Sequence, residues 1–372
     1  MGRIEKIQQF VQKERTLIQK YHFEGLYLNN IVLQQFTRHE LNALFILTVK
    51  KPLELVKIFN VSFCMLEEQI NHPAYRYFTL PKKNGGSRDI YAPSVKLKSI
   101  QQCLNYYFQA YYLFIKPEEV HGFVINPHYL GKRCNIAENA KAHVKKKYVL
   151  NIDLQDFFPN IKAKRVKETF LSPVFNFNEQ IATALTLLTT YKGLLPAGAP
   201  TSPVISNFIC LKLDKELKYF SELNDLTYTR YADDLTFSSN HEIPGDMILD
   251  IICIIHRNDF RINEKKLRLK PSNRKQTVTG ITVNQKVNVD RKLLKKTRAM
   301  IHDLGTHGLY AATSRHFKVA EDKNSSLNAK FIRRLQGYIN FIGQVRGRDD
   351  AVYLKLKTTY LSLFSFQTED FC

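Results

Sequence analysis

The sequence predicts an α+β fold in which a central group of short strands is framed by helical segments. Apolar residues recur at helical spacing near both ends of the chain. Several short strand-like runs, bounded by turn residues, occupy its middle. The length of 372 residues exceeds that of one typical domain, so we expect two or three domains.

The first 70 residues are expected to be helical, because apolar positions such as Ile7 and Leu44 follow a helical period with few Gly or Pro. Residues 77–80 and 88–91 then resemble two short strands. The segment between them is basic and contains two glycines, which is typical of a hairpin turn. We therefore expect a cationic β-hairpin directly after the N-terminal helices.

Two strand-like segments contain carboxylates where a buried strand would end. Residues 148–154 form an apolar run that reaches Asp153, and residues 226–238 alternate around Asp233 and Asp234. An unpaired charge at such a position is unfavourable unless something binds it. The alternative is that the two adjacent acids are solvated residues of a tight hairpin.

None of the other expected elements has a carboxylate at the end of a buried strand. The sequence predicts helices over 96–112, 203–213 and 249–258, a strand pair over 278–283, and a helical, basic C-terminal third. In the second of these helices, Ser202 is expected to be the N-cap and Pro203 the first helical residue.

The charge balance points to a polyanionic partner. The chain has 55 Lys and Arg against 34 Asp and Glu, a net charge of +21. Nucleic acid is the first candidate and an anionic membrane surface the second. With 44% hydrophobic residues, the chain is expected to be globular rather than a disordered basic tail. No run approaches the roughly 18 apolar residues of a membrane span, and no signal peptide is apparent, so we expect a cytoplasmic protein.

Three motifs that follow in order identify the acids. They are residues 153–159, which begin with Asp153, the Pro- and Gly-containing segment 195–203, and Tyr231-Ala232-Asp233-Asp234. This ordered set resembles the reverse transcriptase family. The resemblance implies a right-hand polymerase with fingers, a palm made of an antiparallel sheet backed by helices, and a helical thumb. It also implies RNA-directed DNA polymerase activity.

The same resemblance implies a site for two Mg²⁺ ions. Asp153 and Asp233 would bridge both ions, Asp234 would support them, and the Leu154 carbonyl would add another oxygen. Magnesium prefers such oxygen ligands together with substrate phosphates and water. Two cations about 4 Å apart can act on both the attacking and the leaving oxygen of a nucleotidyl transfer.

Further residues match the family's positions for the incoming dNTP. Phe158 matches the bulky residue beneath the sugar that excludes a 2′-hydroxyl; the alternative is an ordinary core Phe. Arg88, with Lys82 or Lys83, matches the cations that grip the triphosphate. Lys266 matches the lysine that protonates the departing pyrophosphate, although a solvated lysine at a helix end would look the same.

The segment 195–203 carries one departure from the family pattern. Gly198 matches the family's glycine in the nucleotide pocket, but Ala197 stands where Gln is usual. A contact that the Gln side chain would make to the incoming nucleotide is therefore absent here, and its consequence does not transfer to this chain.

Two shorter motifs point to one subfamily. Asn139-Ala140-Lys141-Ala142-His143 and Val278-Thr279-Gly280 resemble signatures of retron reverse transcriptases. A retron enzyme copies its cognate structured non-coding RNA into branched multicopy single-stranded DNA (msDNA), starting from the 2′-hydroxyl of a guanosine. The resemblance also implies anti-phage defence with a separate effector protein. The alternatives are an abortive-infection or diversity-generating reverse transcriptase, or a binding subunit that controls an effector.

Nucleic-acid contacts are expected from both motifs and from the basic C-terminal third. The candidates are Asn139, His143, Tyr231, Val278, Thr279, Gly280, Arg291, Lys295, Arg333 and Arg334. Phosphate contacts from the arginines and lysine would give affinity without sequence choice. The resemblance divides the chain into an N-terminal extension (1–70), fingers (71–147), palm (148–277, with a fingers insertion at about 162–195) and a region with the thumb and tail (278–372).

Overall fold

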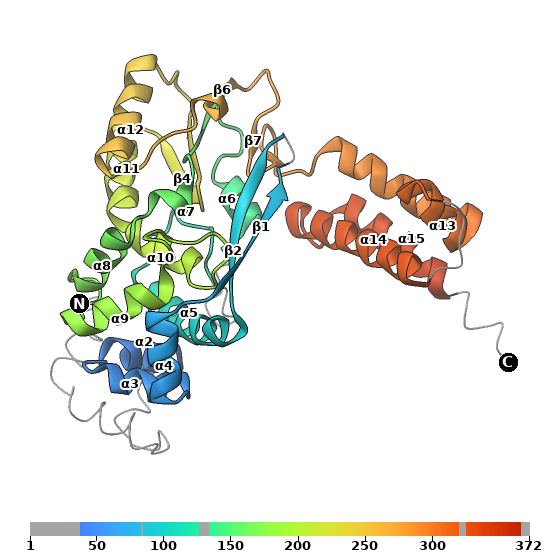
Figure 1. Cartoon of the computed structure of the whole chain (residues 1–372). Helices are drawn as coiled ribbons and strands as arrows, with labels where there is room; N and C mark the ends of the chain where they lie inside the picture. Colours follow the sequence, from blue (N-terminus) through green and yellow to red (C-terminus); the bar gives the residue numbers. More distant parts are fainter. Residues whose placement is uncertain (1–37, 83–84, 126–133, 320–324, 366–372) are drawn as a thin grey trace. The chain divides into compact units, whose positions relative to one another are not determined.

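The computed structural model describes residues 38–82, 85–125, 134–319 and 325–365 (Figure 1). Its mixture of helices and short strands confirms the expected α+β class. Two sequence-based expectations, the helical position of Ile7 and the dNTP contact of Lys83, lie outside the described residues.

Within the described residues from Arg38 onward, the N-terminal helices confirm the expected helical character. They are α2 (Arg38–Leu47), α3 (Pro52–Phe59) and α4 (Phe63–Asn71), and after the first hairpin comes α5 (Val95–Ile115). Leu44 is fully buried where α2 packs against α5. The hydroxyl of Ser94 accepts a hydrogen bond from the Leu97 amide and so caps the start of α5.

The expected cationic hairpin consists of β1 (Tyr75–Pro81) and β2 (Ser87–Pro93). The two strands are antiparallel, and Leu80 lies opposite Arg88. Figure 1 shows them as a two-stranded ribbon separate from the central sheet. The exposed Arg88 therefore lies next to the turn of a hairpin with most of its residues solvent-exposed.

The central sheet carries the predicted acids. Its strands are β3 (Tyr148–Asp153), β4 (Thr227–Tyr231), β5 (Asp234–Ser239) and β6 (Arg268–Pro271), in the order β4-β5-β3-β6. Val149, Leu150 and Ile152 of β3 are almost fully buried, so this strand is covered on both faces. Because β3 and β5 are neighbours, the end of one strand lies beside the start of the other.

Six of the described helices lie between residues 157 and 257. They are α7 (Phe157–Asn160), α8 (Ala163–Leu171), α9 (Glu179–Thr189), α10 (Ser202–Ile209), α11 (Leu211–Leu223) and α12 (Gly245–Arg257). The prediction that Ser202 is an N-cap was wrong, because α10 begins at Ser202 itself. The Ser202 hydroxyl instead donates to the Pro196 carbonyl at 2.6 Å. Helix α12 begins at Gly245, four residues before its expected start.

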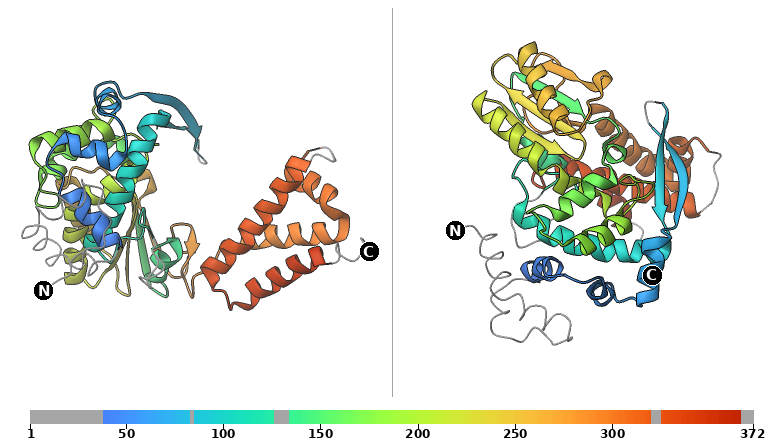
Figure 2. Two further views of the ribbon diagram at one scale, coloured as in Figure 1. Left: turned by 90° about the horizontal axis from the view of Figure 1, so that it is seen from below. Right: turned by 60° about the vertical axis from the view of Figure 1, so that its left-hand side comes forward.

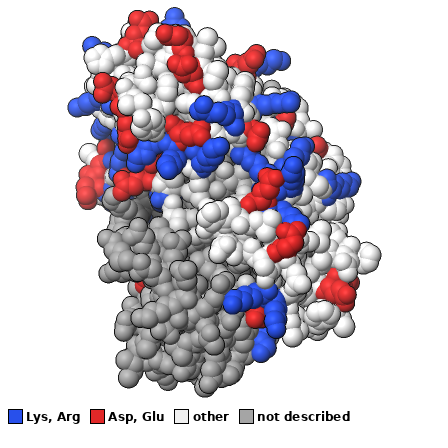
Figure 3. All heavy atoms as spheres, turned by 90° about the vertical axis from the view of Figure 1, so that its left-hand side faces the viewer, with Lys and Arg blue, Asp and Glu red and all other residues white. Residues whose placement is uncertain are grey.

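Acidic and basic side chains are interspersed over α11 and α12 (Figure 3). Glu216 of α11, for example, lies 3.3 Å from the Arg257 guanidinium and 3.9 Å from the Lys212 ammonium. Exposed pairs of this kind contribute little to stability. The visible, described part of this face is therefore not a uniformly basic surface.

The chain forms two compact units, each with its own core. The first contains residues 1–134, 151–235 and 243–267, and the second residues 135–150, 236–242 and 268–372. Helices and strands of the second unit include α6 (Ile136–Lys141), β7 (Thr277–Val278), β8 (Ile281–Thr282), α13 (Arg291–Phe317), α14 (Ser325–Arg346) and α15 (Ala351–Ser365). The division into fingers, palm and thumb remains a prediction.

Helices α13, α14 and α15 pack against one another (Figure 2). Phe331, Leu335 and Ile342 lie on one face of α14 and are fully buried in the core of the second unit. This confirms the expected helical character of the C-terminal third within the described residues. Among the helices of the described residues, none combines the length and apolar character that crossing a bilayer requires.

Candidate active site

A two-residue turn brings the predicted acids together. Strand β4 ends at Tyr231 and β5 begins at Asp234, with Ala232 in the left-handed region at φ +60°. The Leu154 amide donates to the Asp233 carbonyl at 2.9 Å. This bond ties the turn to the residue that follows Asp153, and so it places acids from two distant segments beside each other.

The electrostatics of this corner disfavour the ionised form of its carboxylates. Burial raises the pKa of Asp233, and the Asp153 carboxylate raises it further. Asp234 is an exposed residue at the start of β5, but partial desolvation of its carboxyl, together with Asp233 and Asp153, raises its pKa to about 6. The ionised carboxylates are thus less favourable here than in water, and bound positive charge would relieve both causes.

Lys266 supplies one such charge. Its ammonium lies 2.6 Å from Oδ1 of Asp153, and its side chain is 52% exposed. The lysine ends a 3-10 turn, Glu264–Lys266, whose backbone is tied to Asp153 because the Asn263 amide donates to the Asp153 carbonyl. Lys266 and Arg88 both oppose the rise in the pKa of Asp233. The structure therefore places Lys266 against Asp153, and its role as a proton donor remains a prediction.

The donor set fits divalent metal ions. Within the described residues, no three His, Cys, Asp or Glu side chains converge as a ready-made metal cage. A polymerase site does not need one, because Mg²⁺ binds through one or two carboxylates and completes its shell with substrate phosphates and water. The mutual repulsion of Asp153, Asp233 and Asp234, with a lysine ammonium against one of them, is the observation that supports this fit.

Phe158 lies on α7, directly after β3. Its ring is half-buried and stands between two aromatic neighbours. The ring centroid is 5.4 Å from that of Phe157 and 5.9 Å from that of Phe123. The side chain is therefore partly accessible, as a residue that meets a substrate must be, and it is not a fully buried core Phe.

The Pro-Ala-Gly segment lies against the β1–β2 hairpin. The Tyr91 amide of β2 donates to the Ala197 carbonyl at 2.8 Å. Gly198 has φ +116°, and a Cβ there would lie 2.8 Å from the Ile90 side chain and 2.9 Å from the Tyr91 carbonyl oxygen. Glycine is thus required where the hairpin meets this segment. Lys82 and Arg88 of the hairpin are both exposed.

Gly122, which was not identified from the sequence, lies against the backbone of the turn that carries the acids. A Cβ on Gly122 would lie 2.4 Å from the Ala232 amide nitrogen and 2.9 Å from the Tyr231 carbonyl carbon. Both neighbours are backbone atoms, which cannot move aside as a flexible side chain can. The contact joins residues about 110 positions apart, and no local pattern around Gly122 signals it.

Gly122→Ala is expected to reduce DNA synthesis by at least about 10-fold, because the added methyl group displaces the turn that carries Asp233. Primer extension on an RNA template measures the effect. Gly245→Ala is the matched control, since a Cβ at Gly245 would have no atom within 4 Å. Full activity of Gly122→Ala would show that the turn tolerates displacement and would contradict the close-approach argument.

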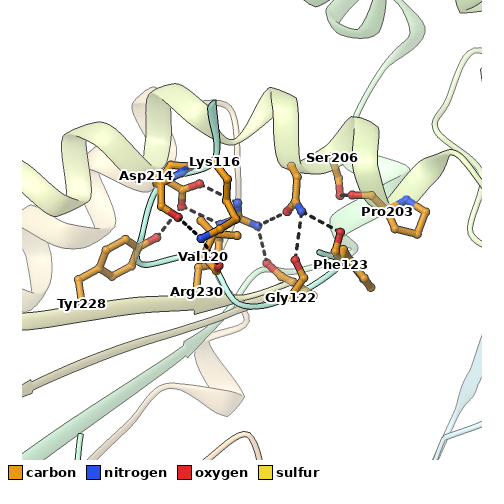
Figure 4. Close-up of polar contacts among 12 residues, drawn as sticks. Lys116, Val120, Gly122, Phe123, Pro203, Ser206, Asp214, Tyr228 and Arg230 are labelled. Atoms are coloured by element: carbon orange, nitrogen blue, oxygen red, sulfur yellow. Dashed lines mark hydrogen bonds and ion pairs between the residues drawn. The ribbon is translucent and has the colours of Figure 1, made fainter. Parts of the chain in front are cut away.

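A buried ion pair that holds strand β4 of the β4–β5 hairpin was also not predicted from the sequence. Arg230 of β4 donates from Nε and Nη2 to the two carboxylate oxygens of Asp214 in α11, each at 2.7 Å, and both side chains are fully buried. Arg230 also donates to the Ala232 carbonyl at 3.2 Å, and Tyr228 donates to Asp214 at 2.8 Å (Figure 4). Burial opposes the charge on Arg230, but Asp214 outweighs it and keeps the arginine pKa well above its ordinary value. The pair thus fixes the strand that precedes the acids.

The two short motifs of the second unit pack together. Helix α6, which contains Asn139, packs on the β7–β8 hairpin, and the Thr279 hydroxyl donates to the Ile136 carbonyl. His143 Nδ1 lies 2.7 Å from the Ser238 hydroxyl. Thr279 and Gly280 both have positive φ, as a two-residue hairpin turn requires.

Burial changes the interpretation of these motifs. Asn139, His143 and Val278 are each at most 1% exposed, so the structure gives them no surface with which to touch RNA. We predicted direct contacts for them; their observed place is the interior, where they stabilise the second unit. Thr279 is half-buried and Gly280 exposed, and a nucleic-acid contact of either remains a prediction.

The predicted thumb cations lie on the surface. Arg291, Lys295, Arg333 and Arg334 are all exposed. The Arg334 guanidinium covers the ring of Phe317 at 4.6 Å from its centroid, which places its charge over the α13–α14 contact. Tyr231 is half-buried at the end of β4. These positions leave the cations accessible to a ligand phosphate.

Comparisons with known proteins agree with this geometry. Residues 80–283, more than half of the chain, match the family model of the reverse transcriptase (RNA-dependent DNA polymerase). The retron Ec86 reverse transcriptase of Escherichia coli is 35% identical over 236 residues, which cover 62% of this chain and 70% of that protein. The retron Ec73 enzyme of E. coli is 30% identical, with coverage of 76% and 85%.

Two further proteins are also similar to this chain. The retron Mx65 reverse transcriptase of Myxococcus xanthus is 31% identical, over 63% of this chain and 56% of that protein. A telomerase structure from Candida albicans aligns with a TM-score of 0.44 and 10% identity, over 78% of this chain and 63% of that one. With the acidic turn in the expected place and relatives matched over most of their length, the chain belongs to the retron reverse transcriptases, which are RNA-directed DNA polymerases.

Proposed function

We propose that this enzyme copies its cognate structured non-coding RNA into branched msDNA. The observation that carries the proposal is the placement of Asp153 beside the turn that carries Asp233 and Asp234, with the Lys266 ammonium against Asp153, in a chain related to retron enzymes. The net charge of +21 supports binding to both the RNA template and the DNA product.

In this proposal Asp153 and Asp233 hold two Mg²⁺ ions, with support from Asp234 and the Leu154 carbonyl. Bound there, the ions would activate the primer hydroxyl and neutralise charge on the triphosphate. Phe158 lies beneath the sugar, and Lys266 Nζ gives a proton to the pyrophosphate oxygen as it leaves.

The remaining contacts are assigned to position the substrates. Arg88, together with Lys82 or Lys83, binds the triphosphate, and the segment with Ala197 and Gly198 borders the nucleotide. The exposed thumb cations bind backbone phosphates, which gives affinity without sequence choice. We place the reaction in the cytoplasm, where RNA and dNTPs are available. We further propose that enzyme and msDNA act together with a separate effector protein in anti-phage defence.

Primer extension tests the polymerase part of this proposal. The full-length protein is incubated with poly(rA), an oligo(dT) primer and dTTP, first in EDTA and then with added Mg²⁺. We expect no extension in EDTA and recovery with Mg²⁺, because the acidic corner lacks sufficient positive charge of its own. Extension that persists in EDTA would contradict the metal assignment, and no extension with Mg²⁺ would contradict the activity.

Phe158→Ala is expected to lower the preference for dATP over ATP by about 10- to 200-fold, because the ring no longer fills the space of a 2′-hydroxyl. The measurement is the ratio of kcat/KM for the two nucleotides on an RNA template with a DNA primer. Phe158→Tyr keeps the ring and should keep the preference. An unchanged ratio in Phe158→Ala would remove the steric role from this residue.

A further inference from the structure

We propose that Phe123 is a second determinant of sugar selection, because its ring stacks on the Phe158 ring and helps to hold it in place. The inference rests on the proposed role of Phe158. It adds a residue that no motif indicated and that lies outside segments 153–159 and 195–203. Phe123 is a positioning residue in this account, since it acts through Phe158 and not on the nucleotide.

The two rings form a stacked pair. Their centroids are 5.9 Å apart and their planes differ by 29°, a favourable offset geometry for aromatic side chains. The Phe158 ring also contacts the Phe157 ring, at 5.4 Å and 49°. Phe157 in turn stacks on Phe260, so this neighbour of Phe158 is itself supported. A steric barrier works only if the ring cannot retreat, and the stacked Phe123 ring is a second aromatic neighbour that restricts the Phe158 ring.

The backbone of Phe123 is held in a conformation that a bulky residue rarely adopts. Its φ is +59°, in the left-handed region, which is unfavourable for a side chain of this size. Such a conformation persists only where the surroundings impose it. Here the Gln109 side chain imposes it from two sides: its amide donates to the Phe123 carbonyl at 2.9 Å, and its oxygen accepts from the Ile125 amide at 3.3 Å.

The same segment is bonded to the catalytic hairpin. The Asn207 amide donates to the carbonyls of Gly122, at 3.1 Å, and Phe123, at 3.4 Å. The Asn207 oxygen in turn accepts from Arg230 Nη1 at 3.0 Å (Figure 4). Because Arg230 also donates to the Ala232 carbonyl, one network of hydrogen bonds positions both the acidic turn and Phe123, the residue stacked on Phe158. The distance between the metal-binding acids and the sugar-contacting ring is thereby set by common supports.

The experiment measures the dATP-to-ATP ratio of kcat/KM, with a defined RNA template and DNA primer, for Phe123→Leu, Phe158→Ala and the double variant. Phe123→Leu is expected to lower the ratio by roughly 2- to 10-fold, mainly through a lower KM for ATP. In the Phe158→Ala background the same change should have no further effect on the ratio, because residues that act through one contact are not additive. Phe123→Tyr retains the ring and should retain the wild-type ratio.

Two further measurements separate positioning from general damage. Phe45→Leu in α2 is the matched control, a half-buried Phe changed in the same way, and its ratio should equal that of the wild type. Phe123→Met replaces Phe123→Leu if the latter does not melt cooperatively. If Phe158→Ala alters selection and neither Phe123 variant does, the inference is wrong while the role of Phe158 stands. A Phe123 effect of equal size in the Phe158→Ala background would also overturn it. If Phe158→Ala has no effect, the proposed role of Phe158 fails and the inference fails with it.

Discussion

Asp233→Asn is expected to lower the rate of DNA synthesis by about 1,000-fold or more. The substitution keeps the size of the side chain but removes the charge with which it would bind metal ions, and several kcal/mol of transition-state stabilisation are lost with it. The same change should leave the free energy of unfolding unchanged or raise it slightly. Burial and the Asp153 carboxylate disfavour the ionised form of Asp233, as its raised pKa shows, so a neutral Asn relieves a repulsion in the metal-free protein.

Primer extension and thermal melting of the same preparations check both halves of this expectation. Asp250→Asn is the matched control, because Asp250 is an exposed acid on α12 and its loss should change neither quantity. A destabilised Asp233→Asn would indicate a structural role for the carboxylate. Activity close to that of the wild type would remove Asp233 from the catalytic site.

Asp214→Ala is expected to destabilise the protein by about 3 to 5 kcal/mol, the largest stability effect we predict for a single substitution. It leaves the guanidinium of Arg230 buried without its partner, and both side chains are fully enclosed in the native structure. Chemical denaturation measures the loss. Glu168→Gln is the comparison, since Glu168 forms only an exposed contact, 3.9 Å from Lys164, and no measurable change is expected.

A double replacement distinguishes positioning from stability. Asp214→Leu combined with Arg230→Met removes both charges, and most of the lost stability should return. DNA synthesis by this double variant should remain well below that of the wild type. The Ala232 carbonyl and the Asn207 oxygen have lost the arginine that donates to them. Recovery of both stability and full activity would show that the pair does not position the catalytic turn.

The acids could be predicted because each lies in a motif whose residues are adjacent in the sequence. Tyr231-Ala232-Asp233-Asp234 predicts its own hairpin, and the structure joins β4 to β5 at that point. Asp153 ends an apolar run that forms β3. Local order in the sequence was therefore enough to identify these elements and the carboxylates that they carry.

The supports of the site could not be predicted in this way. Gly122 and Asp214 act on the hairpin through contacts across many residues, and neither lies in a local pattern that shows its partner. Among these supporting residues Arg230 is the one with a local sign of its role, because it is a charged residue in a strand whose neighbouring residues are buried. The opposite error concerns His143, whose motif was recognised but whose full burial excludes the surface role that we expected.

Sequencing the nucleic acid that co-purifies with the full-length protein tests the central claim most directly. The account predicts a single-stranded DNA joined to one structured RNA through a 2′–5′ linkage at a guanosine. It predicts that the same RNA, without DNA, is recovered with Asp233→Asn. Recovery of RNA alone with the wild-type enzyme, of DNA without a branch, or of branched DNA with Asp233→Asn would contradict it.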